Sequence, residues 1–328
     1  MPLSASTDTG QETPATGLGG LGVRAFVARY GVIIALVVLL IAALIWTPDF
    51  YSASALRNTT RSAAILGLVA LGQFLVLMVR GVDLSVGSVI AFSAVLLADR
   101  GPGLPIAIVW VLALAVGVGL LNSFFIVRRR VPAFVATFGM LIAVEGLRQA
   151  YTRGSASGSV PSSITQLGRS TLFGLTYPVY VAVALMVLAG IFLYRTRSGR
   201  RMIMAGSNPE MAQLSGVRTG WIVTGAFVVS ALLAALAGFF LAASTGYVDR
   251  FIGRGTDLDS VTAALLGGAR FSGGEGSIVG MAAGCLLLAS IFTIIVQLGW
   301  RPELQLIAKG AVLIGALAVQ SSLRSGSR

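Results

Sequence analysis

Long apolar runs recur along almost the whole chain, and they limit its possible folds more than any other feature. They fall at roughly 28–46, 62–79, 84–98, 104–127, 131–150, 177–194, 221–243, 258–269, 278–298 and 303–319. Crossing the hydrocarbon core of a bilayer takes about 20 apolar helical residues. A helix also satisfies its own backbone hydrogen bonds, which lipid cannot do. The sequence therefore predicts an all-α polytopic membrane protein with about ten transmembrane helices.

The charge balance agrees with this prediction. Only 11% of the residues are charged, whereas soluble domains carry about 25%. The formal net charge of +12 would suggest a nucleic-acid partner in a soluble protein. Here the arginines stand between apolar runs, as the positive-inside rule requires of a membrane protein. The expected partner is the lipid bilayer, and no nucleic acid is expected.

Three regions follow from this pattern. Residues 1–23 are rich in Ser, Thr, Gly and Pro and predict a disordered tail, and 321–328 form a second short tail. Between them, residues 24–320 form the transmembrane domain, whose first run is interpreted as an uncleaved span. The cluster Arg128-Arg129-Arg130 indicates a cytoplasmic loop and so places both tails in the cytoplasm.

Two of the runs, 84–98 and 258–269, are short for a bilayer and predict broken or re-entrant helices. Each follows a Gly-x-Asp-Leu sequence, at Gly81 and at Gly255. On the predicted topology the first sequence lies at the inner side and the second at the outer side. That arrangement is typical of two inverted-topology repeats. An aspartate that caps a helix explains the shared letters equally well.

Several absences exclude functions. The chain has no histidine, which rules out a Ser-His pair and imidazole proton relays. Its only lysine, Lys309, stands between Ala308 and Gly310, so it belongs to no Walker A loop. The single cysteine, Cys285, is interpreted as a small core residue. We therefore expect no enzyme and no cofactor bound by this chain.

Five ionisable residues lie in or near the predicted spans, and each needs a partner or water at that depth. They are Arg80, Asp83, Glu145, Arg148 and Lys309. In the segment 81–93, Asp83 or Ser85 can cap the helix that follows, and Ser88 keeps its surface small and polar. Helix packing and a path for a hydrophilic solute both remain open for this segment.

A basic and polar loop at 196–220 contains a compact helix signal. Asn208-Pro209-Glu210 starts the helix with a cap, a proline in the first turn and an acid at the positive helix end. Gly216 can end it in the left-handed conformation. A helix this short is unstable alone in water. The alternative is a solvated connector, but the capping and the apolar edge of Met211 and Leu214 favour docking to another protein.

Four segments resemble one known family. They are GVDLSVGSV at 81–89, VPAFVATFGML at 131–141, GRRMIMAGSNPEMAQLSGV at 199–217 and DLDSVTAALLGGARFSGGEGSIVG at 257–280. Together they are similar to the permease subunits of the ribose/xylose/arabinose/galactose group of bacterial ABC importers. The resemblance implies a multi-pass protein of the bacterial inner membrane that translocates a monosaccharide.

The resemblance also implies partners. A periplasmic sugar-binding protein would deliver the solute to a permease pair, formed with a second copy or with a paralogue. A separate ABC ATPase subunit would use ATP-Mg and receive the short helix of the 196–220 loop in a groove. The residues implied in this coupling are Arg200, Asn208, Pro209, Glu210, Met211, Leu214 and Gly216.

A candidate solute pathway combines the residue pattern with the resemblance. It comprises Asp83, Ser85, Ser88, Phe134, Thr137, Thr293 and Gln297. Thr293 and Gln297 stand where many sugar permeases have asparagines, and Arg80 stands where relatives usually have a small residue. These departures leave the solute open: a branched-chain amino acid, a nucleoside or an autoinducer sugar is the alternative cargo. A proton-coupled secondary transporter that uses Asp83, Glu145 or Lys309 is the alternative from another class.

Overall fold

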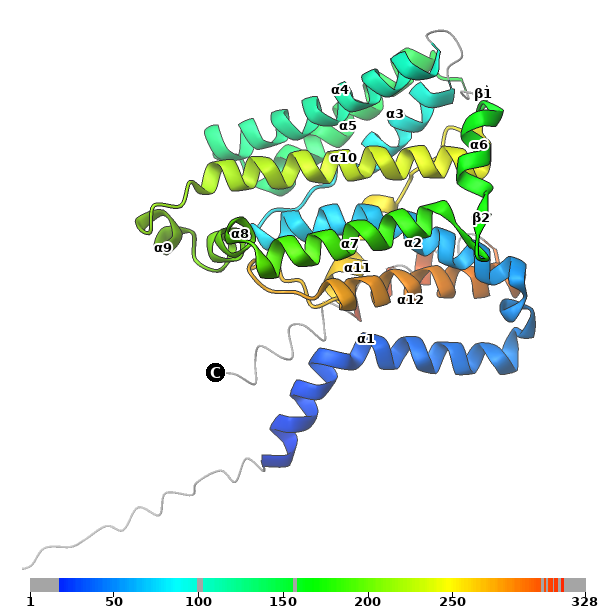
Figure 1. The fold of residues 1–328 in the computed structure, drawn as a ribbon, viewed down its shortest axis with the longest axis horizontal. Coiled ribbons are helices and arrows are strands. Elements are labelled where there is room, and N and C mark those ends of the chain that lie inside the picture. The colour runs from blue at the N-terminus through cyan, green and yellow to red at the C-terminus, as the bar shows by residue number, and fades with distance from the viewer. Residues whose placement is uncertain are drawn as a thin grey trace, which may run out of the picture.

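The structure, a computed structural model, describes residues 18–98, 103–155 and 158–301, and then 304, 306–308, 310–311 and 314–315. Side chains are described from Tyr30 onward. Helices dominate this part of the chain and form one bundle, with α8 and α9 at one end and α6 and β1 at the other (Figure 1). The predicted all-α polytopic membrane fold is confirmed.

Six helices of the described part are long and apolar enough to cross a bilayer. They are α2 (Ala53–Met78), α4 with the π-helical turn η2 (Leu104–Ser123 and Phe124–Arg128), α5 (Ala133–Thr152), α7 (Tyr177–Arg195), α10 (Thr219–Thr245) and α12 (Ile278–Gln297). Each corresponds to a predicted apolar run. Helix α1 (Leu18–Trp46) adds a shorter apolar stretch from Tyr30 onward.

The two short helices predicted from the sequence are present. Helix α3 (Val86–Ala98) has 13 residues and α11 (Thr256–Leu266) has 11. At 1.5 Å per residue they are about 20 and 17 Å long, less than the hydrocarbon core of about 30 Å. The tenth run, 303–319, lies largely outside the described residues, and Lys309 lies outside them too. The count of ten spans and the inverted repeats therefore stay predictions.

Helices α2 and α10 form the centre of the bundle. Helix α2 packs against α7, α10, α11 and α12, and α10 packs against α2, α3 and α4. Two glycines allow close contact: a Cβ on Gly72 would lie 2.9 Å from Cα of Ser230, and one on Gly119 would lie 2.6 Å from Cα of Val228. Small residues at such crossings bring helix backbones together in lipid, where no hydrophobic effect drives association.

The periphery of the bundle is largely apolar and exposed. In α5 and α7 only 17% of the most apolar window is buried within the chain. Helix α1 packs along α12 at one edge of the bundle (Figure 1). Because these outer helices show apolar side chains to their surroundings, they are the surfaces available to lipid or to a second membrane subunit.

The end of the bundle opposite α9 carries small elements that the apolar runs did not predict. They are the 3₁₀ turn η1 (Pro48–Tyr51), α6 (Ser162–Arg169) and the strands β1 (Gly158–Ser159), β2 (Thr171–Leu172), β3 (Leu175–Thr176) and β4 (Tyr247–Val248). Strand β1 pairs antiparallel with β4, and β2 with β3. Two-residue strands show no alternation in the sequence, so long-range pairing alone reveals them.

The predicted tails differ from the structure at one boundary. Helix α1 begins at Leu18, so residues 18–23 are helical rather than part of a disordered tail. No proline stands between Leu18 and Trp46 to stop the helix. Residues 1–17 and the second tail, 321–328, lie outside the described residues.

Candidate functional site

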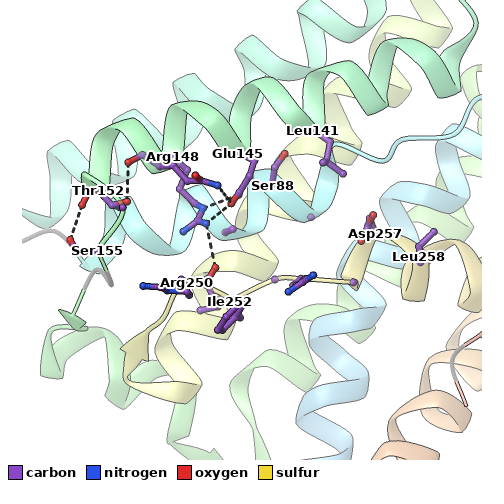
Figure 2. A pocket seen from close by; sticks show the side chains of 18 of the residues that line it. Ser88, Leu141, Glu145, Arg148, Thr152, Ser155, Arg250, Ile252, Asp257 and Leu258 are labelled. Atoms are coloured by element: carbon purple, nitrogen blue, oxygen red, sulfur yellow. Dashed lines mark hydrogen bonds and ion pairs between the residues drawn. The ribbon is translucent and has the colours of Figure 1, made fainter. Parts of the chain in front are cut away.

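A cavity of about 1100 Å³ opens between α3, α5 and the segment 250–258 that leads into α11 (Figure 2). We call it the α5 cavity. Three of its lining residues, Thr152, Ser155 and Arg250, stand close in sequence to the β1–β4 ladder, and β1 lies at the end of the bundle opposite α9 (Figure 1). Its polar lining residues are Ser88, Glu145, Arg148, Gln149, Thr152, Ser155, Arg250, Arg254 and Asp257. Such a mixture of hydroxyl, amide and charged groups can fix the orientation of a small polar solute.

Glu145 and Arg148 form a fixed charged pair on the cavity face of α5. The Arg148 guanidinium donates to both Glu145 oxygens, at 2.9 Å from Nε and 2.5 Å from Nη2. Nη2 also donates to the backbone oxygen of Arg250 at 3.3 Å (Figure 2). The Arg148 side chain is 5% exposed and that of Glu145 is 34% exposed. Pairing makes the buried guanidinium tolerable at this depth, and the carboxylate remains accessible from the cavity.

Both short helices begin at this cavity. Gly87 and Ser88 in the first turn of α3 line it, as do Asp257 and Leu258 in the first turn of α11. A Cβ on Gly87 would lie 3.5 Å from Oδ1 of Asp257. The two predicted repeat blocks therefore meet, with the positive ends of two helices at one cavity.

The Asp83 carboxylate is fully buried and does not line the cavity. Its Oδ1 accepts from the backbone N–H of Ser85 at 3.0 Å and from the Ser85 hydroxyl at 2.5 Å. Its Oδ2 accepts from the Ser230 hydroxyl on α10 at 3.0 Å. These bonds hold the loop between α2 and α3 against the central helix α10.

Three further helices send polar groups to the same loop. The Asn122 amide on α4 donates to the Ser85 hydroxyl at 2.9 Å, and the Thr137 hydroxyl on α5 donates to the backbone oxygen of Val82 at 3.1 Å. On α2, the Gln73 amide pairs with the backbone N–H and C=O of Asp83 in the orientation that satisfies both groups. We call Gln73, Asp83, Ser85, Asn122, Thr137 and Ser230 the Asp83 network.

Among the residues of the predicted solute pathway, Ser88 alone lines the α5 cavity. Asp83, Ser85 and Thr137 are buried in the Asp83 network. The Phe134 ring is exposed on α5 and stacks on Phe138. The Thr293 hydroxyl on α12 hydrogen-bonds that of Thr59 on α2 at 2.8 Å, and Gln297 is exposed at the end of α12.

The predicted solute pathway omitted the other polar residues that line the cavity, which are Glu145, Arg148, Gln149, Thr152, Ser155, Arg250, Arg254 and Asp257. A signal for part of the cavity was present: positions 141, 145, 148, 149 and 152 share one face of a helix. The glutamate and arginine on that face predict a polar surface. Position 250 carries no such signal, because an irregular segment brings it to the cavity. The described residues contain no group of three or more Cys, Asp or Glu side chains that could hold a metal ion.

The predicted coupling loop forms two helices, α8 (Arg197–Ser207) and α9 (Pro209–Leu214). Oδ1 of Asn208 accepts from the N–H of Met211 at 3.1 Å, and Gly216 has a φ of +77°. The predicted capping is thus confirmed, whereas helix α8 was not predicted. Arg200, Asn208, Glu210 and Gly216 are exposed and Pro209 is half-buried.

The apolar edge of α9 points away from the bundle. Met211 is 56% exposed and Leu214 is 83% exposed, whereas Ala212 between them is buried. We call Met211 and Leu214 the α9 edge. Exposed apolar side chains of this kind form a surface that another protein can cover.

Gly206 allows a test of how α8 packs against the end of α2. A Cβ at Gly206 would lie 1.7 Å from the backbone oxygen of Met78, at the end of α2. Gly206→Ala should therefore push α8 from α2 and destabilise the purified protein by about 1–3 kcal/mol, measured as a lower Tm. Gly225→Ala on α10, where a Cβ would meet no atom within 4 Å, is the control. Equal Tm values for the two variants would contradict this packing.

Comparison with known proteins assigns the chain to a family. Residues 55–317 match the family model described as "Branched-chain amino acid transport system / permease component". The chain is 32% identical over 304 residues to the autoinducer 2 import system permease protein LsrC of Enterobacter sp. (strain 638), covering 92% of this chain and 85% of that protein. It is also 32% identical to the proteins of the same name from Escherichia coli O157:H7 and Yersinia enterocolitica.

The match to the Escherichia coli protein covers 84% of this chain and 82% of that protein, and the match to the Yersinia protein covers 80% and 74%. No solved structure gives a significant match. The family model covers most of the described bundle, from α2 through α12. The chain therefore belongs to this permease family and is a multi-pass membrane component of an ABC importer.

Proposed function

We propose that this chain forms the translocation path for a monosaccharide-sized, polyhydroxylated solute and is driven by a separate ATPase. The main support for this function is that two different surfaces lie at opposite ends of one bundle. Residues of the polar α5 cavity stand next to the β1–β4 ladder in sequence, and the exposed α9 edge belongs to the other end of the bundle (Figure 1). A solute site and a docking site separated in this way are what an externally driven importer needs.

The lining of the cavity supports a sugar-like solute. Glu145 keeps a carboxylate partly exposed beside the amide of Gln149, which donates to it at 3.0 Å. Carboxylates accept hydrogen bonds from hydroxyl groups, and guanidinium and amide groups donate to them. The similar proteins are named for import of autoinducer 2, and the family model for branched-chain amino acids. Both solutes are alternatives for this chain.

Partners and orientation follow from the same two surfaces. The α9 edge would dock on the ATPase subunit, which uses ATP-Mg, and both termini would lie on the same, cytoplasmic side. The cavity would then open toward the periplasm, where a binding protein delivers the solute. A second permease copy, or a paralogue, would pack on an exposed apolar helix face. ATP-driven closure would shift the bundle between two states by binding one of them better.

The proposal is tested with proteoliposomes that contain the permease, an ATPase that co-purifies with it and a periplasmic binding protein from the same organism. Uptake of labelled monosaccharides, of autoinducer 2 and of leucine should identify one solute class, and uptake should require ATP. Uptake that survives ATP depletion but stops with an uncoupler would instead identify a proton-coupled carrier. Preference for leucine would overturn the sugar class while keeping the importer.

A cavity variant gives a sharper prediction. Glu145→Gln keeps the shape of the side chain but removes its charge, and a hydrogen bond to a charged group is worth about 1.5–3 kcal/mol. Uptake by this variant should therefore fall about tenfold or more, with ATPase association retained. Asp49→Asn removes an exposed carboxylate from η1 and should leave uptake unchanged. Wild-type uptake by Glu145→Gln would remove the carboxylate from the solute site.

A further inference from the structure

Arg80 occupies a backbone position that favours glycine. Its N–H bonds to the oxygen of Leu77 at 3.0 Å, and the N–H of Gly81 bonds to the oxygen of Val76 at 2.9 Å. This pair of bonds is the Schellman ending of helix α2, with Arg80 in the left-handed conformation at φ +63°. A residue with a Cβ is strained there and glycine is not. The strain of arginine at this position therefore suggests that its side chain makes a contact that offsets the strain.

That side chain reaches helix α8, which lies 126 residues further along the chain. Nε of Arg80 donates to the backbone oxygen of Gly206 at 2.6 Å, and Nη2 donates to that of Ser207 at 2.6 Å. These carbonyls belong to the last turn of α8. A cation at the negative end of a helix, donating to its terminal carbonyls, is a favourable cap.

The loop that precedes α12 also packs against this contact. The backbone N–H of Gly274 donates to the oxygen of Met78 at 3.0 Å. A Cβ on Gly273 would lie 2.6 Å from Cγ of Arg80 and 2.8 Å from the oxygen of Gly206. The ends of α2 and α8 and the loop that precedes α12 therefore meet around one guanidinium, and α9 begins two residues after the last turn that it caps.

Along the chain, Arg80 is followed three residues later by Asp83. The Asp83 carboxylate bonds to Ser85, which immediately precedes α3, and to Ser230 on α10. The first turn of α3 then lines the α5 cavity through Gly87 and Ser88. A short series of covalent and hydrogen bonds thus connects α8 with the cavity. Among the described residues, Arg80 supplies the only side-chain hydrogen bonds from the α2–α3 loop to α8.

We propose that Arg80 is a positioning residue that ties the α8–α9 segment to the break between α2 and α3, so that displacement of α9 moves the cavity end of α3. The inference rests on the proposed function, because it takes α9 to be the place where the ATPase acts. It goes further by assigning one residue, outside both the docking edge and the cavity, to the transfer of movement between them.

Arg80→Gly separates this role from backbone strain, because glycine suits the left-handed backbone and the change removes the side chain that carries the guanidinium. In the isolated permease, amide hydrogen exchange at residues 204–216 should rise about tenfold or more as the cap of α8 is lost. In the complete importer, solute transported per ATP hydrolysed should fall about tenfold, while the ATPase still co-purifies. Arg80→Lys keeps the charge but not the fork of two donors, and its values should lie between those of wild type and Arg80→Gly.

Arg153→Gly is the matched control. Arg153 is an exposed arginine at the end of α5, also in the left-handed conformation at φ +50°, and this variant should match the wild type in both measurements. Wild-type exchange in Arg80→Gly would overturn the tie to α8. Raised exchange with unchanged solute per ATP would overturn the transfer of movement. A wild-type importer without ATP-dependent uptake would contradict the proposed function instead, and the exchange data would then decide the tie alone.

Discussion

Asp83→Ala is expected to cost more stability than any other single substitution considered, about 3 kcal/mol or more. The change removes the acceptor of three hydrogen bonds, from the N–H and hydroxyl of Ser85 and the hydroxyl of Ser230. Each buried donor left unsatisfied costs about 1–3 kcal/mol, and the fully buried site admits no solvent in exchange. The measurement is the Tm and the folded yield of the purified permease.

Asp249 provides a matched control. Its Oδ1 accepts from the N–H two residues ahead, that of Phe251 at 2.8 Å, as Asp83 does from Ser85, but Asp249 is exposed. Asp249→Ala should therefore change the Tm little, since water replaces the lost bond. A wild-type Tm for Asp83→Ala would show that the Asp83 network does not hold the α2–α3 loop. Lost uptake with unchanged Tm would return Asp83 to the solute pathway.

Placing aspartates on the α9 edge, with Met211→Asp and Leu214→Asp together, is expected to reduce ATPase co-purification tenfold or more. Burying a side chain of this size contributes about 1.5–3 kcal/mol, and 1.4 kcal/mol corresponds to a tenfold change in affinity. Folding should be unaffected because both side chains already lie exposed, with Ala212 making the inward contact. The measurement is ATPase recovered per permease, with the Tm measured in parallel.

Phe173→Asp is the control for that pair. Phe173 is 93% exposed between β2 and β3, at the end of the bundle opposite α9 (Figure 1). It tests whether any acidic substitution at an exposed apolar residue reduces ATPase recovery, and recovery should stay at the wild-type level. If the α9 double variant also retained wild-type recovery, the ATPase would dock elsewhere and the proposed role of α9 would fail.

The 196–220 loop shows which structural features local sequence chemistry can predict. Asn208, Pro209 and Gly216 act on backbone groups within a few residues, so their pattern predicted α9 and both of its ends. Helix α8 was missed because its glycines and basic residues form no long apolar run. Its last turn is stabilised by Arg80 from α2, a contact 126 residues away in the chain, and no local pattern records such a contact.

The two Gly-x-Asp-Leu blocks show what a local pattern cannot predict, which is the surroundings of a side chain. The short apolar runs that follow these blocks predicted two short helices, and both are present. The aspartates of the two blocks nevertheless have different surroundings: Asp83 is fully buried in a network, whereas Asp257 lines the cavity. What separates the two aspartates is the neighbours that other helices supply, such as Ser230 on α10, 147 residues after Asp83.

The sequence by itself determined the all-α membrane fold, the short helices and the capped α9, because apolar length and backbone capping act over one helix or one turn. The tertiary structure alone decided which polar groups are buried and which line the α5 cavity. In a bundle whose helices all carry apolar runs, the partners of a polar side chain are set by helix crossings, and these depend on contacts between residues far apart in the chain. Glu145 therefore lies at the cavity, whereas Asp83 lies inside the bundle.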